Sequence, residues 1–580
     1  MQRSRVRRLS FLQAVNALFD DEPEEDDVGD VLEEVPPAQL HDIPAEDGDN
    51  VPIAVVDDEG DVEVFGSSED ESSEDDSDVE HVANNIVYSE NPPPDRRWNR
   101  NIITDIPRNI AHAQSELEAF LFYLPEEIIR HVLRHTNRKA HDLMQGMREK
   151  PNHFSLFSYS EFIACLGILI RSGSDRSGLT SLDDLWSNIH GKPYYRAVIS
   201  KNRFKFFLRV IRFDNYRTRS QRIQNDRLAA VSEIWAMFLC NLRRFYVPAA
   251  TLTVDEQLLG YRGRIPGRTY MPNKPKKYGL KIFWIAEAGT GFALNGKIYS
   301  GRGVNDPVHR NLAYDVVMQL AEPFFGSGRD IVTDNFFTSH ALAVSLLQKS
   351  LTLLGTIRRH RREVPSVLRQ NREALSSYFL YDLNNKITLV SYAPCRNRIV
   401  TLLSSSHGRG VCPPQDPANR PQMILDYNRG KGGVDQLDEN LAEFSCVRKT
   451  VRWPLLVFFN IIDVACNNAF IHLKRDGYPK TKKVFLRELS VQLATDFAKR
   501  RFQTNRGALR FHKPILQAAE LFGFLPEVDS ESDAANQSLG RCKVCSKVTR
   551  SRCDQCFVFL CPTHRTMKKT CLCTSCVKCM

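Results

Sequence analysis

The chain has 580 residues, more than one hydrophobic core usually accommodates, so we expect several domains. Hydrophobic residues make up 42% and charged residues 26%, which excludes a wholly disordered chain. The net charge of +8 hides an asymmetry, because residues 1–90 hold 28 acids against four arginines while the rest holds 74 Lys or Arg against 42 acids. An acidic tail on a basic body indicates a polyanionic partner, most often nucleic acid.

Residues 1–105 are expected to form a disordered acidic region, because few apolar side chains are available to offset the entropy of ordering. The region opens with a short basic amphipathic stretch, for which partner binding, nuclear import and organelle targeting are alternatives. Five serines between Ser67 and Ser77 each precede an acid by three residues, the pattern of acid-directed kinases. The acidic run is either a solvating tail or a self-inhibiting mimic of DNA.

Apolar residues at helical spacing predict helices at 116–123, 126–135, 159–170 and 231–245, within a helical domain over residues 106–250. From Ala250 the pattern becomes strand-like. We predict strands at 251–259, 281–287 and 292–299, a helix at 313–320, a strand at 330–333, a helix at 339–348 and a strand at 351–357. This order of elements is that of an RNase H-like fold, with its catalytic part over residues 251–357.

The order is then interrupted by residues 358–424, which contain strand candidates at 387–392 and 399–403. The catalytic part is expected to resume over residues 425–445. Its late helix is expected to begin after a flexible glycine-rich stretch at 430–433. Residues 446–526 look helical and basic, with a helical run from Trp453 to about Phe511. The apolar stretch 455–473 contains Asn460 and Asp463, which favours a buried helix over a membrane span. A polar linker, 527–540, precedes a cysteine-rich end, 541–580.

Three acids stand where an RNase H-like fold needs carboxylates: Asp255 in the first strand, Asp334 after the fourth strand and Asp435 at the start of the late helix. Phosphodiester cleavage uses two divalent cations about 3.5–4 Å apart, and carboxylate oxygens suit Mg²⁺ or Mn²⁺. Asp438 lies three residues after Asp435 on the same helical face, as a fourth ligand or a supporting group. The alternative is that these acids only cap turns and helices.

Long motifs give the chain a close resemblance to the piggyBac family of DNA transposases from about residue 110 onward. The motifs are KNRFKFFLRVIRFDN (201–215), VDEQLLGYRGR (254–264), MPNKPKKYGLK (271–281), IVTDNFFTS (331–339), LLGTIR (353–358), YNRGKGGVDQLD (427–438) and RKTVRWP (448–454). The resemblance implies a catalytic triad of Asp255, Asp334 and Asp435, with Asp438 as an additional acid. It also implies an insertion domain at 358–424, and a DNA-binding and dimerisation domain split between 106–250 and 446–526.

The C-terminal end holds nine of the 15 cysteines, in Cys-x2-Cys pairs and a Cys-x2-His that have zinc spacing. Eight ligands suit two interleaved structural zinc sites. One site would use Cys542, Cys545, Cys561 and His564. The other would use Cys553, Cys556, Cys573 and Cys576, although Cys571 and Cys579 compete for the last places. The resemblance implies a cross-brace finger that binds transposon ends; a RING- or PHD-like protein-binding module is the alternative.

Basic residues near these features are the expected DNA contacts. Four arginines in five residues, including Arg358 and Arg361, suit phosphate binding at the start of the insertion, with a solvated run as the alternative. Trp453 either begins a helix in the core or stacks on an unpaired base. The expected contacts are Arg358, Arg361, Arg448, Lys449, Arg452, Trp453, Lys543 and Arg552.

The resemblance implies cut-and-paste transposition, with excision through hairpin ends and integration at TTAA sites. The expected partners are double-stranded DNA, in the form of terminal inverted repeats and the target, and a second copy of the chain. A nuclear location follows from such a substrate, and no membrane partner is expected. The main alternative is a domesticated, non-catalytic DNA-binding protein, against which the intact acids argue.

Overall fold

The computed structural model describes residues 86–94, 108–301 without residues 149, 152, 273 and 275, and 311–504. Closer to the C-terminus it describes residues 521–523, 540–549 without residue 543, 559 and 561–564. The basic N-terminal stretch and the serines at 67–77 lie outside the described residues.

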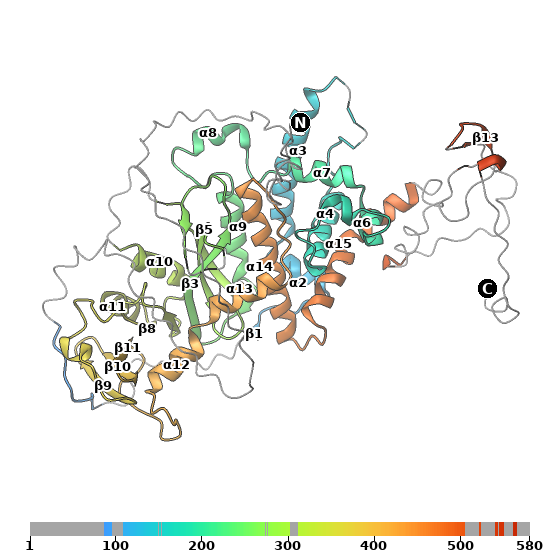
Figure 1. Ribbon diagram of the computed structural model, residues 1–580. Coiled ribbons are helices and arrows are strands. Elements are labelled where there is room, and N and C mark those ends of the chain that lie inside the picture. Colours follow the sequence, from blue (N-terminus) through green and yellow to red (C-terminus); the bar gives the residue numbers. More distant parts are fainter. Residues whose placement is uncertain are drawn as a thin grey trace, which may run out of the picture. The chain divides into compact units, whose positions relative to one another are not determined.

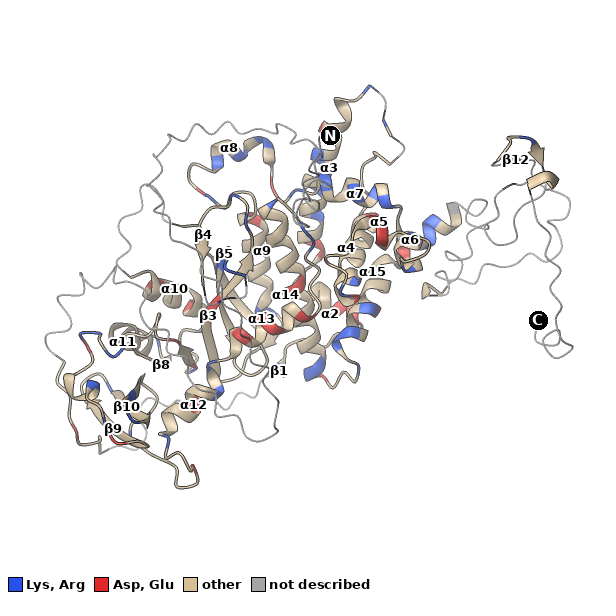
Figure 2. Cartoon of the chain, viewed as in Figure 1, with Lys and Arg blue, Asp and Glu red and all other residues tan. Residues whose placement is uncertain are grey.

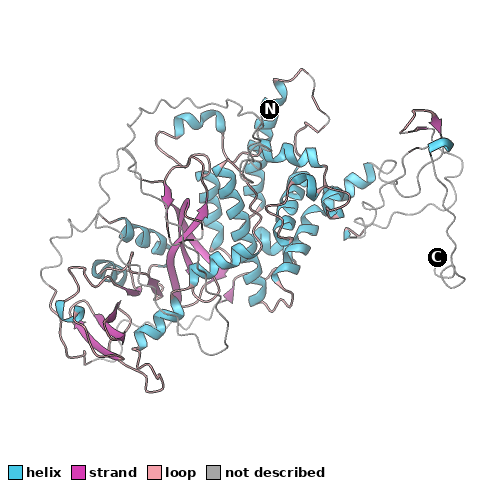
Figure 3. Cartoon of the chain, viewed as in Figure 1, coloured by secondary structure: helices cyan, strands magenta, loops and turns pink. Residues whose placement is uncertain are grey.

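A mixed sheet organises the described part of the chain, with β3 at its centre (Figures 1 and 3). On one side β3 pairs antiparallel with β5, which pairs with β4 and β6; on the other side it runs parallel to β7, and β7 runs parallel to β8. These strands are β3 (Thr251–Gly260), β4 (Arg268–Tyr270), β5 (Tyr278–Glu287), β6 (Ala293–Ile298), β7 (Asp330–Thr333) and β8 (Thr352–Thr356). The predicted order of strands and helices is confirmed except for β4, which was missed.

Strands from residues 358–424 continue the same sheet. β11 pairs antiparallel with β8, and β10 pairs antiparallel with β11 and β9, which brings the sheet to nine strands. They are β9 (Ser376–Asp382), β10 (Ile387–Cys395) and β11 (Arg398–Ser404). The two predicted strands are therefore confirmed and β9 was missed.

Residues 86–94 correct the expectation that the chain is disordered up to residue 105. Ser89 forms an isolated bridge with Tyr381 of β9, with N–O distances of 2.8 and 2.9 Å in the two directions. The Tyr88 hydroxyl donates to the carbonyl of Glu363 at 3.0 Å. β9 is the last strand of the sheet, so its outer backbone groups are available to such a segment.

Most predicted helices are present, some with different ends. α3 runs ten residues further than the predicted 126–135, because its second half is largely polar and lacks the apolar pattern that marks a helix. The helices before β3 are α2 (Glu116–Tyr123), α3 (Glu126–Gln145), α4 (Tyr159–Ser174), α5 (Leu182–Leu185), α6 (Pro193–Val198), α7 (Lys201–Val210), α8 (Arg219–Arg222) and α9 (Ser232–Leu242). Along the chain, α10 (Leu312–Ala321) connects β6 to β7, and α11 (His340–Gln348) connects β7 to β8. The short strands β1 (Arg108–Asn109) and β2 (Tyr246–Val247) pair with each other.

Two long helices replace the single run predicted from Trp453 to about Phe511. α14 (Trp453–Arg475) ends before Gly477, which has a φ of +87°, and α15 (Lys482–Thr504) begins after Pro479. Both residues oppose continuation of a helix. α14 packs against α2, and α15 packs against α4, so the two halves of the helical region share one core. Residues 505–511 lie outside the described residues.

α14 is long and apolar enough to cross a membrane by length and composition. Of its most apolar window, 83% is buried inside the protein, as expected for the central helix of a folded core.

Candidate active site and metal centre

The register of β3 and β7 places Asp255 beside Asp334. The two strands run parallel with Val254 opposite Thr333, so the next residues, Asp255 and Asp334, are neighbours across the sheet. Asp334 is fixed after the end of β7, because its Oδ1 accepts hydrogen bonds from the backbone N–H of Phe336 at 3.0 Å and Phe337 at 3.4 Å. The two carboxylates therefore lie next to each other at the carboxyl end of β7.

The third aspartate comes from α13 (Gly433–Glu443), which contacts β3 and β5 (Figure 1). The chain enters it from α12 (Gln422–Gly430), whose last carbonyl accepts a hydrogen bond from Thr253 Oγ1 at 2.5 Å. A Cβ on Gly433 would lie 2.5 Å from the same Oγ1. The glycine-rich stretch, predicted to be flexible, therefore allows a close approach to the sheet and brings Asp435 into the first turn of α13.

Gly433→Ala should disturb the site, whereas Gly432→Ala should not. A Cβ at residue 433 meets Thr253, while one at residue 432 meets nothing within 4 Å. We expect Gly433→Ala to cost about 1–3 kcal/mol of stability and to lower any activity of the site, because α13 must move away from β3. Denaturant unfolding of both variants measures this, and equal midpoints for the two would refute the close approach.

The charges of Asp334 and Asp435 act on Asp255. Burial raises the pKa of Asp255 well above its usual value, and the charges of Glu256, Asp334 and Asp435 raise it further. Burial and the charge of Glu256 raise the pKa of Asp334 to about 6. Such a gathering of partly desolvated carboxylates is unfavourable by itself and favours a bound cation.

The donor set fits hard divalent cations. Carboxylate oxygens are the ligands that Mg²⁺ and Mn²⁺ prefer. Within the described ranges, the clusters whose ligand atoms all lie within 4.8 Å of one another do not include the three aspartates together. Ligands shared between two ions about 3.5–4 Å apart need not meet that limit, because the outer ligands contact different ions.

A buried amide orients the fourth acid, Asp438. Gln257 Oε1 accepts hydrogen bonds from Trp284 Nε1 at 2.9 Å and from Asn460 Nδ2 at 3.2 Å. Its NH2 group is thereby directed to Asp438. Burial raises the pKa of Asp438 to about 6, and the hydrogen bond from Gln257 opposes part of this rise. Thr253, Asp255 and Gln257 alternate along β3, so all three face α12 and α13.

Further side chains around the aspartates were missed from the sequence, apart from Arg358 and Arg361. Lys274 Nζ lies 3.8 Å from Asp435 Oδ1, and the positive charge of Arg358 lowers the pKa of Asp334. Burial raises the pKa of Tyr427 to about 12, with smaller contributions from the charges of all three aspartates. Glu256, Gln257, Lys274 and Tyr427 all belong to the quoted motifs, but nothing in the spacing alone marks them.

The arginines expected to contact DNA fall into two groups. Arg358 is exposed, and Arg361 is half-buried with Nη2 3.5 Å from the Phe336 carbonyl, beside the turn that fixes Asp334. Arg448, in contrast, is buried and donates to the carbonyls of Ser177 at 3.2 Å and Thr180 at 2.5 Å. Figure 2 shows further Lys and Arg along α7 and α8.

Arg452 resembles Arg448. It donates to the carbonyls of Leu208 at 2.8 Å and Arg209 at 3.3 Å, and also to Ile211, and burial lowers its pKa to about 9. Trp453 begins α14 and packs half-buried against the core, as in its helix-start alternative. Lys449 is exposed. Lys543 and Arg552 lie outside the described residues.

Arg452→Ala should therefore act on stability more than on DNA binding. Removing the guanidinium takes a donor from the carbonyls of Leu208, Arg209 and Ile211, of which the last two also accept from Arg212, and we expect this to cost about 1–2 kcal/mol. Lys449→Ala is the matched control and should leave stability within about 0.5 kcal/mol. Chemical denaturation and DNA affinity measured in parallel test this; a DNA-binding defect in Arg452→Ala at unchanged stability would assign the guanidinium to DNA instead.

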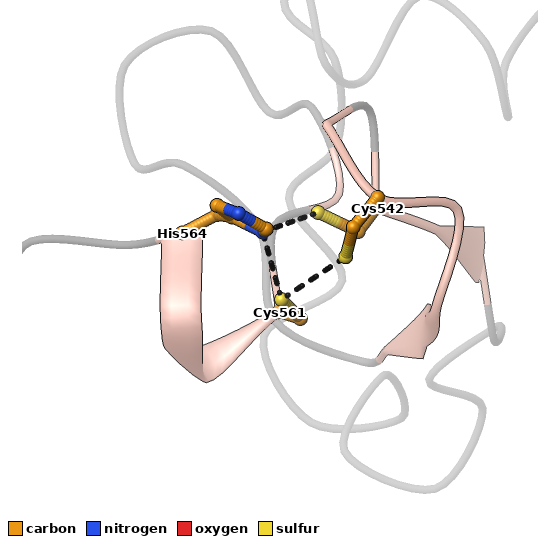
Figure 4. Close-up of side chains that lie close together, drawn as sticks. Cys542, Cys561 and His564 are labelled. Carbon is orange, nitrogen blue, oxygen red and sulfur yellow. Dashed lines mark hydrogen bonds between the residues drawn. The ribbon is translucent and has the colours of Figure 1, made fainter.

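A separate cluster of side chains that could bind a metal ion lies near the C-terminus. The ligand atoms of Cys542, Cys545, Cys561 and His564 all lie within 4.8 Å of one another. Figure 4 shows the side chains of Cys542, Cys561 and His564 pointing toward one another. The first Cys pair sits on a tight turn, in which the Ser546 N–H donates to the Cys542 carbonyl at 2.8 Å. This turn joins β12 (Gly540–Arg541) to β13 (Val548–Thr549).

The spacing fits a tetrahedral zinc ion. Cys545 Sγ and Cys561 Sγ are 3.6 Å apart, and His564 Nδ1 lies 3.7 Å from Cys542 Sγ and 3.2 Å from Cys561 Sγ. Zinc–sulfur bonds of 2.3 Å give tetrahedral edges of about 3.8 Å between sulfurs. The structure thus brings together the four residues predicted for the first site. Cys553, Cys556, Cys571, Cys573, Cys576 and Cys579 lie outside the described residues.

Comparisons with known proteins agree with this picture. A family model described as Transposase IS4 matches residues 115–470. The human PiggyBac transposable element-derived protein 3 is 25% identical over 492 residues, 76% of this chain and 74% of that protein. The human PiggyBac transposable element-derived protein 2 is 23% identical over 377 residues, 61% of each chain. A cryo-EM structure of a piggyBac transposase synaptic complex with hairpin DNA matches with a TM-score of 0.69 and 32% identity, over 79% of this chain and 98% of that one.

Proposed function

The chain belongs to the piggyBac-type family of transposases, and from this premise we propose that it is a catalytically active, metal-dependent DNA transposase. The observation that carries the proposal is that Asp255 on β3, Asp334 directly after β7 and Asp435 on α13 come together, so that the charges of the last two act on Asp255. A non-catalytic protein has no need for a buried carboxylate, Asp255, that two neighbouring aspartates repel. We assign β3, β5, β6, β7, β8 and α13 to an RNase H-like core.

Asp255, Asp334 and Asp435 would hold two Mg²⁺ or Mn²⁺ ions, which when bound activate the attacking oxygen and stabilise the leaving oxygen of a phosphodiester. The chain's own side chains do the remaining work. Gln257, held by Trp284 and Asn460, orients Asp438 toward the site. Lys274, Arg358 and Arg361 lie around the carboxylates and suit contacts with DNA phosphates.

For the full reaction we propose excision through hairpin ends and integration at TTAA, by a dimer or larger assembly on DNA in the nucleus. The similar solved structure is a synaptic complex with hairpin DNA, which supports a multimeric assembly and a hairpin intermediate here as well. The Cys542–His564 centre, with a second zinc site beyond the described residues, would form a finger that binds the terminal inverted repeats. The alternative for this finger is a protein-binding module.

An excision and integration assay tests the proposal. A marker flanked by the genomic sequences that border this gene is supplied with the protein in cells, and donor and target junctions are sequenced. We expect excised donors with restored TTAA and insertions at TTAA only. Binding of these sequences without excision would instead support a domesticated DNA-binding protein.

The raised pKa values predict that acid increases the Mg²⁺ concentration that the reaction requires. Asp334 and Asp438 have pKa values of about 6, so each holds a proton to a higher pH than a free carboxylate does. Below about pH 6 protons compete with the cations, and the Mg²⁺ concentration for half-maximal DNA cleavage should rise about tenfold per pH unit for each displaced proton. Mg²⁺ titrations between pH 8 and pH 5 measure this; a constant requirement would contradict the assignment.

A further inference from the structure

A second cluster of ligating side chains lies far from both sites in the sequence. His131 and His135 stand four residues apart on α3, so they share one helical face. Glu233 lies in the first turn of α9, which contacts α3. One nitrogen of each ring and one carboxylate oxygen of Glu233 all lie within 4.8 Å of one another. Nothing in the proposed transposition chemistry uses these three residues.

The distances fit the edges of a tetrahedral site. His131 Nε2 lies 3.3 Å from Glu233 Oε2 and 3.1 Å from the backbone carbonyl oxygen of Phe213. Metal–nitrogen and metal–oxygen bonds of 2.0–2.2 Å give edges of about 3.3–3.4 Å between ligand atoms. The carbonyl oxygen of Phe213 thus lies at a ligand-to-ligand distance from His131 Nε2.

His135 supplies an independent observation. Its side chain is buried, with 7% of its surface exposed, and its Nδ1 is buried without a hydrogen-bond partner. Its ring lies against that of His131, with ring centroids 4.6 Å apart. A buried polar atom with no partner is costly unless something binds it.

We propose that His131, His135 and Glu233, together with the Phe213 carbonyl oxygen, bind one Zn²⁺ ion that ties α3 to α9. Two imidazoles and a carboxylate suit zinc, whereas they do not suit Mg²⁺, which prefers oxygen ligands. α9 leads through β2 into the catalytic strand β3, so the ion would join the helical region to the segment that enters the active site.

The charges near this cluster bear on its strength. Arg134 and Arg138 act on His135 as cations, and the buried Asp214 carboxylate opposes them. Arg219 and Arg222 pair with Asp214, which leaves Glu233 as the anion of the cluster itself. We therefore expect weaker zinc binding here than at the thiolate site, and earlier loss of this ion to a chelator.

Metal content of the full-length chain tests the proposal, with excess Mg²⁺ present to occupy the aspartates. Glu233→Gln and His131→Asn should each lower zinc by about one ion per chain. His141→Asn, on the exposed side of the same helix and outside the cluster, is the control and should keep the wild-type content. In cobalt-loaded protein, the wild-type spectrum minus that of Glu233→Gln should show a tetrahedral band without thiolate charge transfer. Equal zinc content in Glu233→Gln and wild type would overturn the proposal.

A measurement on the wild-type chain removes any dependence on the folding of variants. Alkylation of the thiols with N-ethylmaleimide blocks the cysteine site, and excess Mg²⁺ occupies the aspartates. The alkylated protein should still bind about one zinc ion per chain. If it binds none while circular dichroism shows retained helix, the cluster is only an ion pair between His131 and Glu233.

Discussion

Asp255→Asn, Asp334→Asn and Asp435→Asn are each expected to abolish DNA nicking and strand transfer, with a loss of at least about 100-fold, while DNA-end binding stays nearly intact. Each change replaces a charged carboxylate with a neutral amide, which holds a divalent cation poorly. None of the changes removes a contact to DNA. The folded chain should be no less stable, because each change removes at least one of the repulsions that Asp334 and Asp435 exert on Asp255.

Asp496→Asn is the matched control, since Asp496 is an exposed acid on α15 and its loss changes the net charge by the same amount. Cleavage rates, end affinity and melting temperature are measured on all four variants. If one of the three site variants cleaved DNA as fast as Asp496→Asn, that aspartate would have to be removed from the catalytic set.

Cys545→Ser is expected to abolish specific recognition of the transposon ends and to leave nonspecific DNA binding. The thiolate belongs to the four-ligand cluster, and in so small a segment metal binding and folding are one equilibrium. The core with the catalytic aspartates is built from other residues and should remain folded. Zinc should fall by two ions if the finger is cross-braced, because interleaved ligands leave neither site formed alone.

Cys395→Ser serves as the control, because Cys395 is an exposed thiol on β10 outside the cluster. Zinc per chain and affinity for terminal-repeat DNA are measured on the same preparation. Loss of zinc with unchanged end recognition would move that recognition to another part of the chain and favour the protein-binding alternative for the finger.

The sequence predicted the elements that carry the catalytic aspartates because their information is local. A short apolar strand followed by an acid marks Asp334, and an acid at a helix start marks Asp435. The glycine-rich stretch at 430–433 was interpreted as flexible. Glycine is needed there because Thr253, on a strand distant in sequence, comes too close to leave room for a side chain on Gly433. The support for Asp438 was missed for the same reason, because Gln257 is held by Asn460, about 200 residues away.

Charge in the sequence does not distinguish a DNA contact from a structural residue. Arg448 and Arg452 were both expected to contact DNA, yet their guanidinium groups donate to backbone carbonyls of residues 177–211. The His131 cluster gave no sequence pattern beyond one His-x3-His, because Glu233 comes from another helix and Phe213 acts through its backbone. Only tertiary structure reveals such groups.

The most direct test of the central claim is cleavage of the element's own ends by the purified full-length chain. A labelled duplex with the terminal inverted repeat and a TTAA flank is incubated with the protein in Mg²⁺, Mn²⁺ or EDTA, and products are resolved on a denaturing gel. The account predicts nicking and then hairpin formation in either metal and neither product in EDTA. A folded protein that binds the duplex yet leaves it uncut in both Mg²⁺ and Mn²⁺ would contradict it.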